Sequence, residues 1–378
     1  MSSIEKRIRE GGSTTYLARW RDPSGIQCKQ TFARKRDADA HLTRIEQSKL
    51  SGEYVSRERG RMTVADWSAR WLATRTGSLK PKTVASYESL LRTRVLPTWG
   101  TVPLARVTYE GVGAWVAQMR GELSASRTRQ AYHLLTAMLD GAVRAGRLAR
   151  NPASGVELPR LPTTTRRYLT HAQVAALAEA CGRHRTLVLT LAYTGLRWGE
   201  ATALRVGSMD LLRGRLEVVE AVVDVNGRMI LGAPKSHQSR SVPVPRFLRD
   251  DLATQLAGKA PRDLVFPSST GSVLRVQNWR RGCFDRAARN VGLDGLVPHE
   301  LRHTAASLAI AAGASVKGVQ AMLGHASATL TLDRYGHLFE GELDALADRL
   351  DAAARAQSVP QVCPEATVTP ITQRENTS

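Results

Sequence analysis

The stretch PHELRHTAA, residues 298–306, carries side chains whose spacing allows two different chemistries. His299, Glu300 and His303 fit H-E-x-x-H, in which two imidazoles one helical turn apart bind zinc and the glutamate is the general base. His299 and Arg302 instead present an imidazole and a guanidinium on one helix face, where they can hold a phosphate. One site cannot serve both purposes, so the rest of the chain must decide between them.

The zinc interpretation requires a third ligand. The extended form H-E-x-x-H-x-x-G-x-x-H would place glycine at 306 and histidine at 309, and both positions are alanine. No acidic residue follows His303 before Asp333, although a more distant glutamate ligand stays open. A zinc hydrolase would also leave the basic charge of the chain without a role. We therefore keep it as the second interpretation and expect no metal site.

The phosphate interpretation predicts further cationic and proton-transferring groups in the same part of the chain. TGLRWGE places an arginine and a glutamate three apart at an expected helix start, and PKSHQSR places a lysine in an expected hairpin turn. A histidine follows a glycine helix stop in MLGHAS, and LDRYGHL supplies a tyrosine. These residues are Arg197, Glu200, Lys235, His325 and Tyr335.

In this order the segments resemble the motif set of the tyrosine recombinases, the phage integrase family. That set is T-G-x-R-x-x-E, a hairpin lysine, H-x-L-R-H, L-G-H and a tyrosine shortly beyond, and all of it is present here. The resemblance covers most of residues 168–345, and five motifs in the same order make it specific. It implies site-specific recombination of double-stranded DNA at attachment sites, integrating or excising a mobile element such as a prophage, without a cofactor.

The resemblance also implies a role for each matched residue. Tyr335 would be the nucleophile, because a phenolate can attack a phosphodiester and leave again, which gives a 3′-phosphotyrosyl intermediate. Arg197 and Arg302 would stabilise charge on the transferring phosphate with paired hydrogen bonds. Lys235 would protonate the departing 5′ oxygen. A rival interpretation, a DNA-binding protein of recombinase descent without catalysis, is disfavoured because every expected catalytic position is filled.

Three matched residues would support this chemistry. His299 would assist deprotonation of the tyrosine or hydrogen-bond the phosphate, His325 would donate to the phosphate, and Glu200 would orient its neighbours. Other residues of these types are interpreted as structural: His303, His337 and Lys317, together with Tyr193 in the apolar run LVLTLAYTG.

The composition limits the class of partner. The 378 residues include 54 lysines and arginines and 34 acidic residues, which gives a net charge of +20 spread along the whole chain. An excess of this size favours a polyanion, because each neutralised phosphate releases counterions. The start MSSIEKRIREGG lacks an apolar leader, and the chain has no apolar run of membrane-spanning length, so we expect a cytoplasmic, nucleoid-associated protein without a membrane partner.

The elements that must position the site are mainly helices with small β elements. Residues 1–60 predict a small domain, with a hairpin over 13–33 and a helix over 35–50, that resembles the arm-type DNA-binding domain of integrases. Residues 63–150 read as helices throughout and resemble the family's core-binding domain, with Trp67 and Trp71 as core. Candidate DNA contacts in these two domains are Arg19, Arg21, Lys29, Lys80, Lys82, Arg127 and Arg129.

The proline-rich stretch 151–167 predicts a linker, residues 168–355 a catalytic domain with mainly helices and a small sheet, and residues 356–378 a disordered tail. Phe339, Leu343, Leu346 and Leu350 form a narrow apolar seam on a helix. The family resemblance implies a homotetramer on synapsed DNA, in which this helix docks on a neighbouring protomer. A host DNA-bending protein and an excision factor are candidate further partners.

Overall fold

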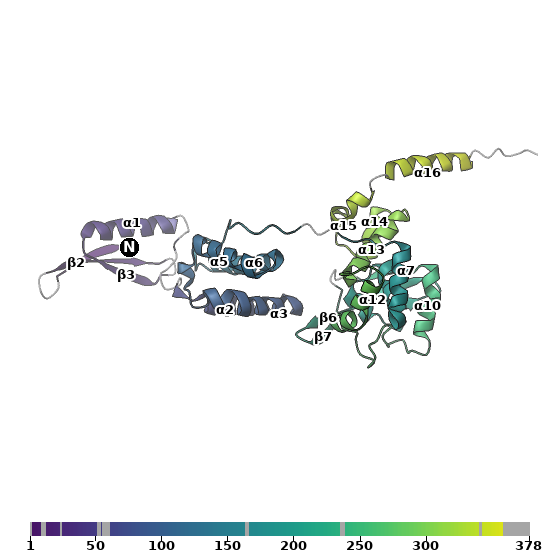
Figure 1. Cartoon of the computed structure of the whole chain (residues 1–378). Helices are drawn as coiled ribbons and strands as arrows, with labels where there is room; N and C mark the ends of the chain where they lie inside the picture. The colour runs from purple at the N-terminus through teal and green to yellow at the C-terminus, as the bar shows by residue number, and fades with distance from the viewer. Residues whose placement is uncertain are drawn as a thin grey trace, which may run out of the picture. The chain divides into compact units, whose positions relative to one another are not determined.

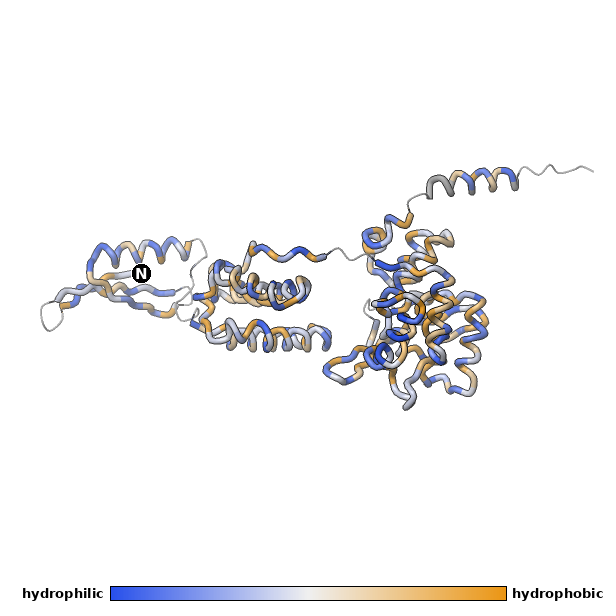
Figure 2. The backbone as a smooth tube through the Cα atoms, in the orientation of Figure 1, coloured by the Kyte–Doolittle hydropathy of each residue, from blue (hydrophilic) through white to orange (hydrophobic). Residues whose placement is uncertain are grey.

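The computed structural model of the protein describes residues 2–8, 13–22, 25–50, 54, 61–162, 166–234, 239–339 and 342–357. The chain divides into two compact units, residues 1–165 with 223–230 and residues 166–222 with 231–378. Helices dominate and the sheets are small and antiparallel (Figure 1), which confirms the predicted fold class. In the tube of Figure 2, polar and apolar residues alternate along the helices, as amphipathic helices around a core require.

The amino-terminal domain is a three-stranded antiparallel sheet followed by one helix. The strands are β1 (Ser3–Ile8), β2 (Thr14–Arg21) and β3 (Gln27–Phe32), in the order β1-β2-β3, and the helix is α1 (Lys35–Leu50). Ala18 and Trp20 of β2 pack with Ala38 and Leu42 of α1. The predicted hairpin and helix are present, whereas β1 was not predicted, because three consecutive charged residues separate Ile4 from Ile8 and no strand alternation is visible.

The second domain is helical and buries a tryptophan-rich core. Its helices are α2 (Val64–Ala73), α3 (Pro81–Leu90), the π-helix η2 (Leu91–Val95), α4 (Leu96–Trp99), the 3₁₀ helix η3 (Leu104–Arg106), α5 (Tyr109–Glu122) and α6 (Ala125–Arg144). Trp67, Trp71, Trp99 and Trp115 all lie in this core, so the prediction that Trp67 and Trp71 are structural is confirmed.

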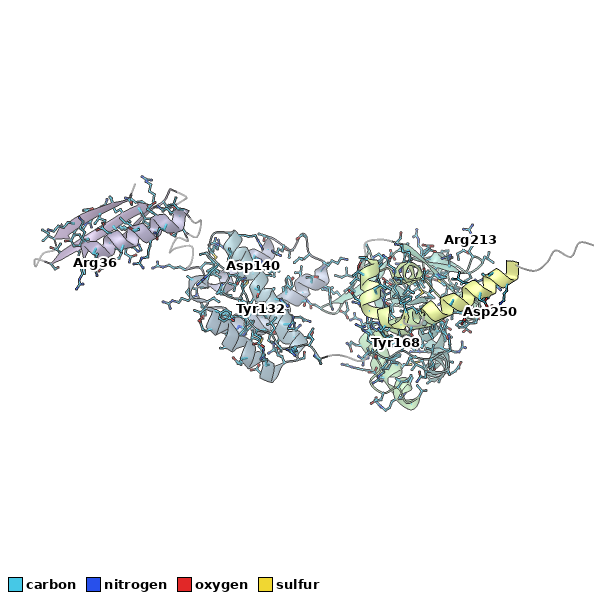
Figure 3. All side chains as sticks on the ribbon, turned by 90° about the horizontal axis from the view of Figure 1, so that it is seen from above. Arg36, Tyr132, Asp140, Tyr168, Arg213 and Asp250 are labelled. Carbon is cyan, nitrogen blue, oxygen red and sulfur yellow. The ribbon has the colours of Figure 1, made fainter. Side chains whose placement is uncertain are left out.

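The first part of the predicted linker belongs to this helical domain. Ala153 and Val156 are buried in its core, and the Tyr132 hydroxyl donates to the Ala153 carbonyl at 2.5 Å. Asn151 Nδ2 donates to Asp140 Oδ1 at 2.6 Å; Figure 3 labels Tyr132 and Asp140, both on α6. The predicted linker therefore begins later than residue 151, because hydrogen bonds to α6 and burial in the core fix the start of this segment.

The carboxy-terminal domain packs its helices around a large apolar core. The α-helices are α7 (His171–Ala180), α8 (Arg185–Thr194), α9 (Trp198–Ala203), α10 (Arg246–Leu256), α11 (Val276–Trp279), α12 (Asp285–Asn290), α13 (Pro298–Ala311), α14 (Val316–Leu323), α15 (Ala328–Tyr335) and α16 (Glu342–Gln357). Shorter turns are the 3₁₀ helices η4 (Gly182–His184), η5 (Val206–Ser208) and η7 (Gly336–Phe339) and the π-helix η6 (Arg280–Phe284).

Two small sheets lie between α9 and α10 in the chain. Strands β4 (Met209–Asp210), β5 (Arg215–Val218) and β8 (Arg240–Pro243) form one sheet, in which Leu216 pairs with Val242. Strands β6 (Ala221–Val225) and β7 (Arg228–Gly232) form the other, and Asn226 and Gly227 join them with positive φ angles, as a tight hairpin turn requires. The predicted Lys235 turn falls between β7 and β8, which belong to different sheets.

Among the described residues, no helix has both the length and the apolar character needed to cross a bilayer. The helix predicted after Tyr335 is present as α16, but Phe339 precedes it in η7 and packs beside the buried Tyr335. At least this residue of the predicted seam contributes to its own domain.

Candidate functional site

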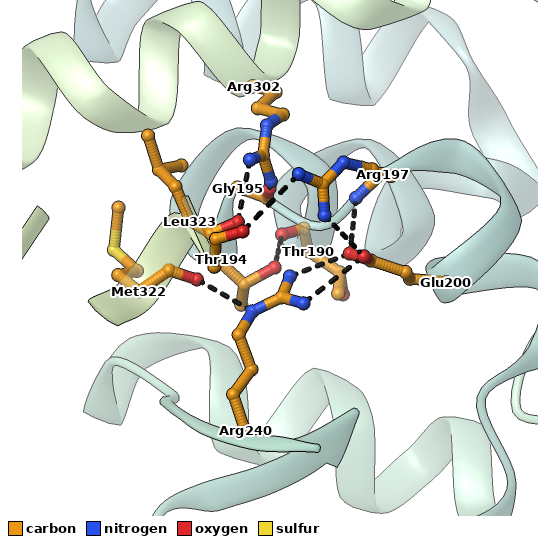
Figure 4. Close-up of polar contacts among 10 residues, drawn as sticks. Thr190, Thr194, Gly195, Arg197, Glu200, Arg240, Arg302, Met322 and Leu323 are labelled. Carbon is orange, nitrogen blue, oxygen red and sulfur yellow. Dashed lines mark hydrogen bonds and ion pairs between the residues drawn. The ribbon is translucent and has the colours of Figure 1, made fainter. Parts of the chain in front are cut away.

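The two predicted arginines lie side by side where α8, α9, α13 and α14 meet (Figure 4). Arg302, on α13, is 3% exposed and donates to the carbonyl oxygens of Gly195 and Leu323, at 2.5 and 2.6 Å. Arg197 immediately precedes α9 and is more open; its Nη1 lies 2.8 Å from Glu200 Oε1. Backbone carbonyls thus hold the guanidinium of Arg302, and the Glu200 carboxylate holds that of Arg197.

Glu200 is the buried hub of this cluster. Its carboxylate is 2% exposed and accepts from the Arg197 main-chain N–H at 2.9 Å as well as from the Arg197 side chain. Arg240, at the start of β8, donates to both Glu200 oxygens at 3.1 and 2.6 Å and to the Met322 carbonyl at 3.1 Å. One carboxylate therefore contacts two arginines, and the predicted role of Glu200 in catalysis stays a prediction.

Arg240 was not singled out from the sequence. Its partners lie 40 residues earlier and 82 residues later in the chain, so spacing contains no signal for the contact. The alternation RSVPV around it indicated only a strand.

Two glycines permit the close approach of these elements. Gly195 ends α8 and Gly324 ends α14, both with φ near +64°. A Cβ at Gly195 would lie 2.6 Å from a Leu323 methyl carbon, and one at Gly324 would lie 2.9 Å from Arg240 Cδ. The glycines of the TGLR and LGH motifs are thus explained by left-handed backbone and by packing against this cluster.

Tyr335 is the last residue of α15 and is fully buried, at 0% exposure. It packs with Ala306, Ile310, Val319 and Leu323, and its hydroxyl lies 2.8 Å from His303 Nδ1. Burial raises the pKa of Tyr335, although the positive charges of Arg302 and Arg334 act in the opposite direction. The hydroxyl is therefore protonated at neutral pH in this structure.

The three histidines near Tyr335 have different surroundings. His299 is exposed, and its ring meets the His303 ring edge-on with centroids 5.0 Å apart. The His325 ring lies parallel to Tyr335, with centroids 6.4 Å apart, and its Nδ1 is 2.9 Å from Thr331 Oγ1. His303 is the buried one of the three, and the structure brings it to the nucleophile's oxygen, a contact that its interpretation as a structural residue had not anticipated.

Desolvation and the neighbouring arginines keep these imidazoles neutral. The pKa values of His303 and His325 are both lowered to about 4, first by desolvation and then by nearby positive charge. The pKa of His299 is lowered for the same reasons, because atoms packed around its ring desolvate it although the residue is exposed. Burial and Arg197 lower the pKa of Arg302 to about 9, which still leaves it charged at pH 7. The site offers fixed positive charge beside neutral proton acceptors.

Lys235 lies outside the described residues, so its predicted place near the phosphate site stays a prediction. Tyr193, interpreted as core, packs against the main apolar cluster and hydrogen-bonds His171 at 2.7 Å.

The residues predicted to contact DNA in the first two domains are either exposed or partly buried. Arg21 and Lys29 are exposed on the sheet face opposite α1, where Arg19 pairs with Glu5 at 2.6 Å. Lys80 and Lys82 are exposed at the start of α3. Arg127 and Arg129 on α6 are half-buried and contact Gln130 and the Pro159 carbonyl. All seven therefore stay predictions as DNA contacts.

The residues of the zinc motif have other partners here. Glu300, the would-be general base, accepts a hydrogen bond from the Val297 main-chain N–H at 2.8 Å and so caps α13, while His303 Nδ1 is engaged with Tyr335. No group of three or more His, Cys, Asp and Glu side chains suited to a metal gathers within the described part of the chain.

Comparison with known proteins agrees with this geometry. Residues 167–342 match the model of the phage integrase family. A putative integrase of prophage phiRv2 from Mycobacterium tuberculosis is 27% identical over 374 residues, covering 93% of this chain and 96% of the relative. The tyrosine recombinase XerD of Pseudomonas aeruginosa is 30% identical over 220 residues, covering 54% of this chain and 68% of the relative.

Solved structures show the same fold. The Tn1549 transposon integrase in complex with a circular intermediate DNA aligns with a TM-score of 0.66 at 21% identity, over 76% of this chain and 99% of that chain. A lambda integrase tetramer bound to a Holliday junction aligns with a TM-score of 0.58 at 19% identity, over 87% and 94%. The family match and these relatives identify a DNA recombinase. This chain belongs to the phage integrase family of tyrosine recombinases.

Proposed function

We propose that this recombinase cuts and rejoins double-stranded DNA at attachment sites through a covalent link between Tyr335 and a 3′ phosphate. The observation that carries the proposal is the convergence of Arg197 with Arg302, His299, His325 and Tyr335 in one domain, although Arg197 lies about a hundred residues before the other four in the sequence. Exchange of one phosphodiester for a phosphotyrosyl ester conserves the bond energy, so no external energy source is needed.

In this proposal Arg197 and Arg302 hold the non-bridging oxygens of the scissile phosphate. Their guanidiniums are already oriented by Glu200, Gly195 and Leu323, so little reorganisation is needed when charge builds up during attack. His325 donates a further hydrogen bond to the phosphate, and His299 binds it or assists the tyrosine. Lys235 protonates the departing 5′ oxygen as general acid.

The domains divide the binding of DNA between them. We assign residues 1–60 to arm-type sites, residues 63–150 to the core site and residues 168–355 to catalysis, with the remaining linker as a tether. By analogy with the lambda integrase tetramer on a Holliday junction, four copies act together on synapsed DNA, in the nucleoid of the host. A host bending protein and an excision factor are further proposed partners, and the substrate is a mobile element such as a prophage.

The helix α16 is proposed to dock on a neighbouring protomer within this tetramer. Deleting residues 338–355 tests the idea: synapsis should be lost while binding to a single core site persists. Unchanged synapsis and recombination would refute docking in trans.

Covalent trapping tests the proposed chemistry. The protein is incubated with labelled duplexes from DNA flanking its own gene, each nicked near the candidate crossover, in EDTA and with a Tyr335→Phe variant alongside. A denaturation-resistant protein–DNA adduct is expected for the unsubstituted protein and not for the variant. Tight, salt-sensitive binding without an adduct would favour a binding-only protein, and EDTA-sensitive cleavage would return attention to a metal hydrolase.

A further inference from the structure

We propose that His303 is a catalytic residue, which holds the Tyr335 hydroxyl before attack and accepts its proton as the bond to phosphorus forms. This inference rests on the proposed function of Tyr335 as the nucleophile. It gives His303, one residue beyond Arg302, the task of activating the nucleophile, which the motif comparison had left to His299.

The contacts distinguish His303 from the two other histidines. His303 Nδ1 lies 2.8 Å from the Tyr335 hydroxyl, within the range required of a general base. The His299 ring meets the His303 ring, and the Nδ1 of His325 is engaged with Thr331. Of the three, His303 is the one whose nitrogen is hydrogen-bonded to the reacting oxygen.

Burial makes this hydrogen bond well defined. Tyr335 is 0% exposed and His303 is 9% exposed, and apolar residues of α13 and α14 surround the tyrosine ring. A buried hydroxyl without a partner is costly, so the pair stays together until DNA arrives. The imidazole is positioned by α13, the same helix that places Arg302, so base and phosphate ligand share one rigid support.

Charge explains why the proton would move only when DNA is bound. Desolvation comes first among the causes that keep His303 neutral, followed by coupling to His299 and by the positive charges of Arg166, Arg334 and Arg302, so the imidazole is a weak base in the free protein. A phosphate bound to Arg302 offsets part of that field and raises the basicity of His303. Binding of the DNA phosphate thus makes His303 a stronger base for the Tyr335 proton.

The step is balanced as follows. The tyrosine O–H bond breaks and its proton passes to His303 Nδ1, while the oxygen's electron pair forms the bond to phosphorus. The bond from phosphorus to the 5′ oxygen breaks, its electron pair stays on that oxygen, and the oxygen takes a proton from the general acid on the leaving side. Rejoining runs in reverse, and His303 returns the proton to Tyr335.

The test changes the acidity of the nucleophile. Single-turnover cleavage of a nicked attachment-site duplex is measured for His303→Gln with either tyrosine or 3,5-difluorotyrosine at position 335; the fluorines acidify the phenol. His303→Gln is expected to lower the cleavage rate by roughly 10²-fold or more with unchanged DNA affinity. In the His303→Gln variant, difluorotyrosine should raise the cleavage rate at least tenfold over tyrosine. The same replacement should raise the rate much less when His303 is present.

The control is His337→Gln, a nearby exposed histidine whose ring nitrogen contacts Tyr168 at 3.3 Å; it should cleave like the unsubstituted protein. A His303→Gln rate within threefold of normal, or equal fluorine effects with and without His303, would overturn the proposal. Failure of the unsubstituted protein to form an adduct would instead count against the proposed function.

A measurement on the unsubstituted chain covers the case in which His303→Gln does not fold. With ¹⁵N-labelled histidine and a nicked duplex plus vanadate, which mimics the transferring phosphate, His303 should change from neutral imidazole to imidazolium at pH 7. A ring that remains neutral in that complex would overturn the proposal.

Discussion

At the scale of single residues, the guanidiniums of the site are held by unlike partners. Arg302 is buried against two backbone carbonyls, whereas Arg197 shares the Glu200 carboxylate with Arg240. A planar fork can bond two carbonyls and still face a phosphate, and an ammonium cannot do this with the same geometry. Charge alone is therefore insufficient at position 302.

Arg302→Lys should consequently lower the rate of covalent adduct formation by at least about 100-fold, because a preorganised donor is lost. Adduct formation on a nicked duplex measures the effect, with DNA affinity as a separate readout. The matched control is Arg280→Lys, since Arg280 forms a half-exposed pair with Asp285 in the same domain and should tolerate the change. Equal behaviour of the two variants would contradict the proposed role of Arg302.

Glu200 predicts a specific dependence of stability on pH. Burial alone would raise its pKa, but the hydrogen bonds and charge of Arg240 and the contacts with Arg197 outweigh burial and lower the pKa to about 2. Because the pKa is depressed in the folded state, the stabilisation is present above the ordinary value of 4.5 and is lost as pH falls from there toward about 2.

Urea unfolding of the unsubstituted protein and of Glu200→Gln checks this expectation. The variant should be less stable at pH 7, since Gln leaves the partly buried Arg197 and Arg240 without their counter-charge. The difference between the two proteins should shrink as pH is lowered from 5 to 3. A difference that is constant with pH would mean that Glu200 is not the group that titrates.

At the scale of elements, the end of α14 is constrained by backbone and packing together. Gly324 has φ +63°, and an added Cβ would meet Arg240 at 2.9 Å. Gly324→Ala should therefore cost about 1–2 kcal/mol in the free energy of unfolding and also disturb His325, the next residue. Chemical denaturation and the adduct assay measure the two effects.

Gly318→Ala, within the same helix, is the control. An added Cβ there makes ordinary contact with Ser315 Oγ at 3.4 Å, and alanine favours helix by up to about 1 kcal/mol. The control should be neutral or stabilising. Similar destabilisation by both substitutions would show that the turn geometry is not what Gly324 provides.

The elements around the site were largely predictable, because capping and glycine signals are local in the sequence. Ser315 and Ser327 begin α14 and α15 by accepting main-chain hydrogen bonds, and the helix stop at Gly324 lies where it was predicted. Arg240 and His303 were not predicted to take part. The partners of Arg240 are distant in sequence, and a histidine four residues after His299 is compatible with a ligand, a core residue or a base until the position of Tyr335 is known.

At the scale of the whole molecule, the +20 charge predicts binding to DNA that weakens steeply with salt. Arg21 and Lys29 lie on the open face of the amino-terminal sheet, so the Arg21→Ser, Lys29→Ser variant should reduce the salt slope on arm-type DNA by about one per lost phosphate contact. Titrations at several salt concentrations measure the slope, and adduct formation on an isolated core site should be unchanged.

Arg36→Ser, Arg44→Ser removes the same charge from the exposed surface of α1 and is the matched control. If this variant lowers the slope as much as the sheet variant does, net charge and not the sheet face determines arm binding.

Because Arg197 and Arg240 share the single Glu200 carboxylate, the site carries excess positive charge. Arg197, Arg240 and Arg302 contribute three positive charges and Glu200 one negative charge, which leaves a surplus of two. In the proposed reaction a phosphodiester brings one negative charge when it binds, and attack by the Tyr335 oxygen, whose proton passes to His303, adds a second at the five-coordinate phosphorus. The two negative charges of the transition state therefore balance the surplus of the arginine cluster, whereas the bound substrate balances only half of it. The electric field of the cluster thus stabilises the transition state more than the bound substrate.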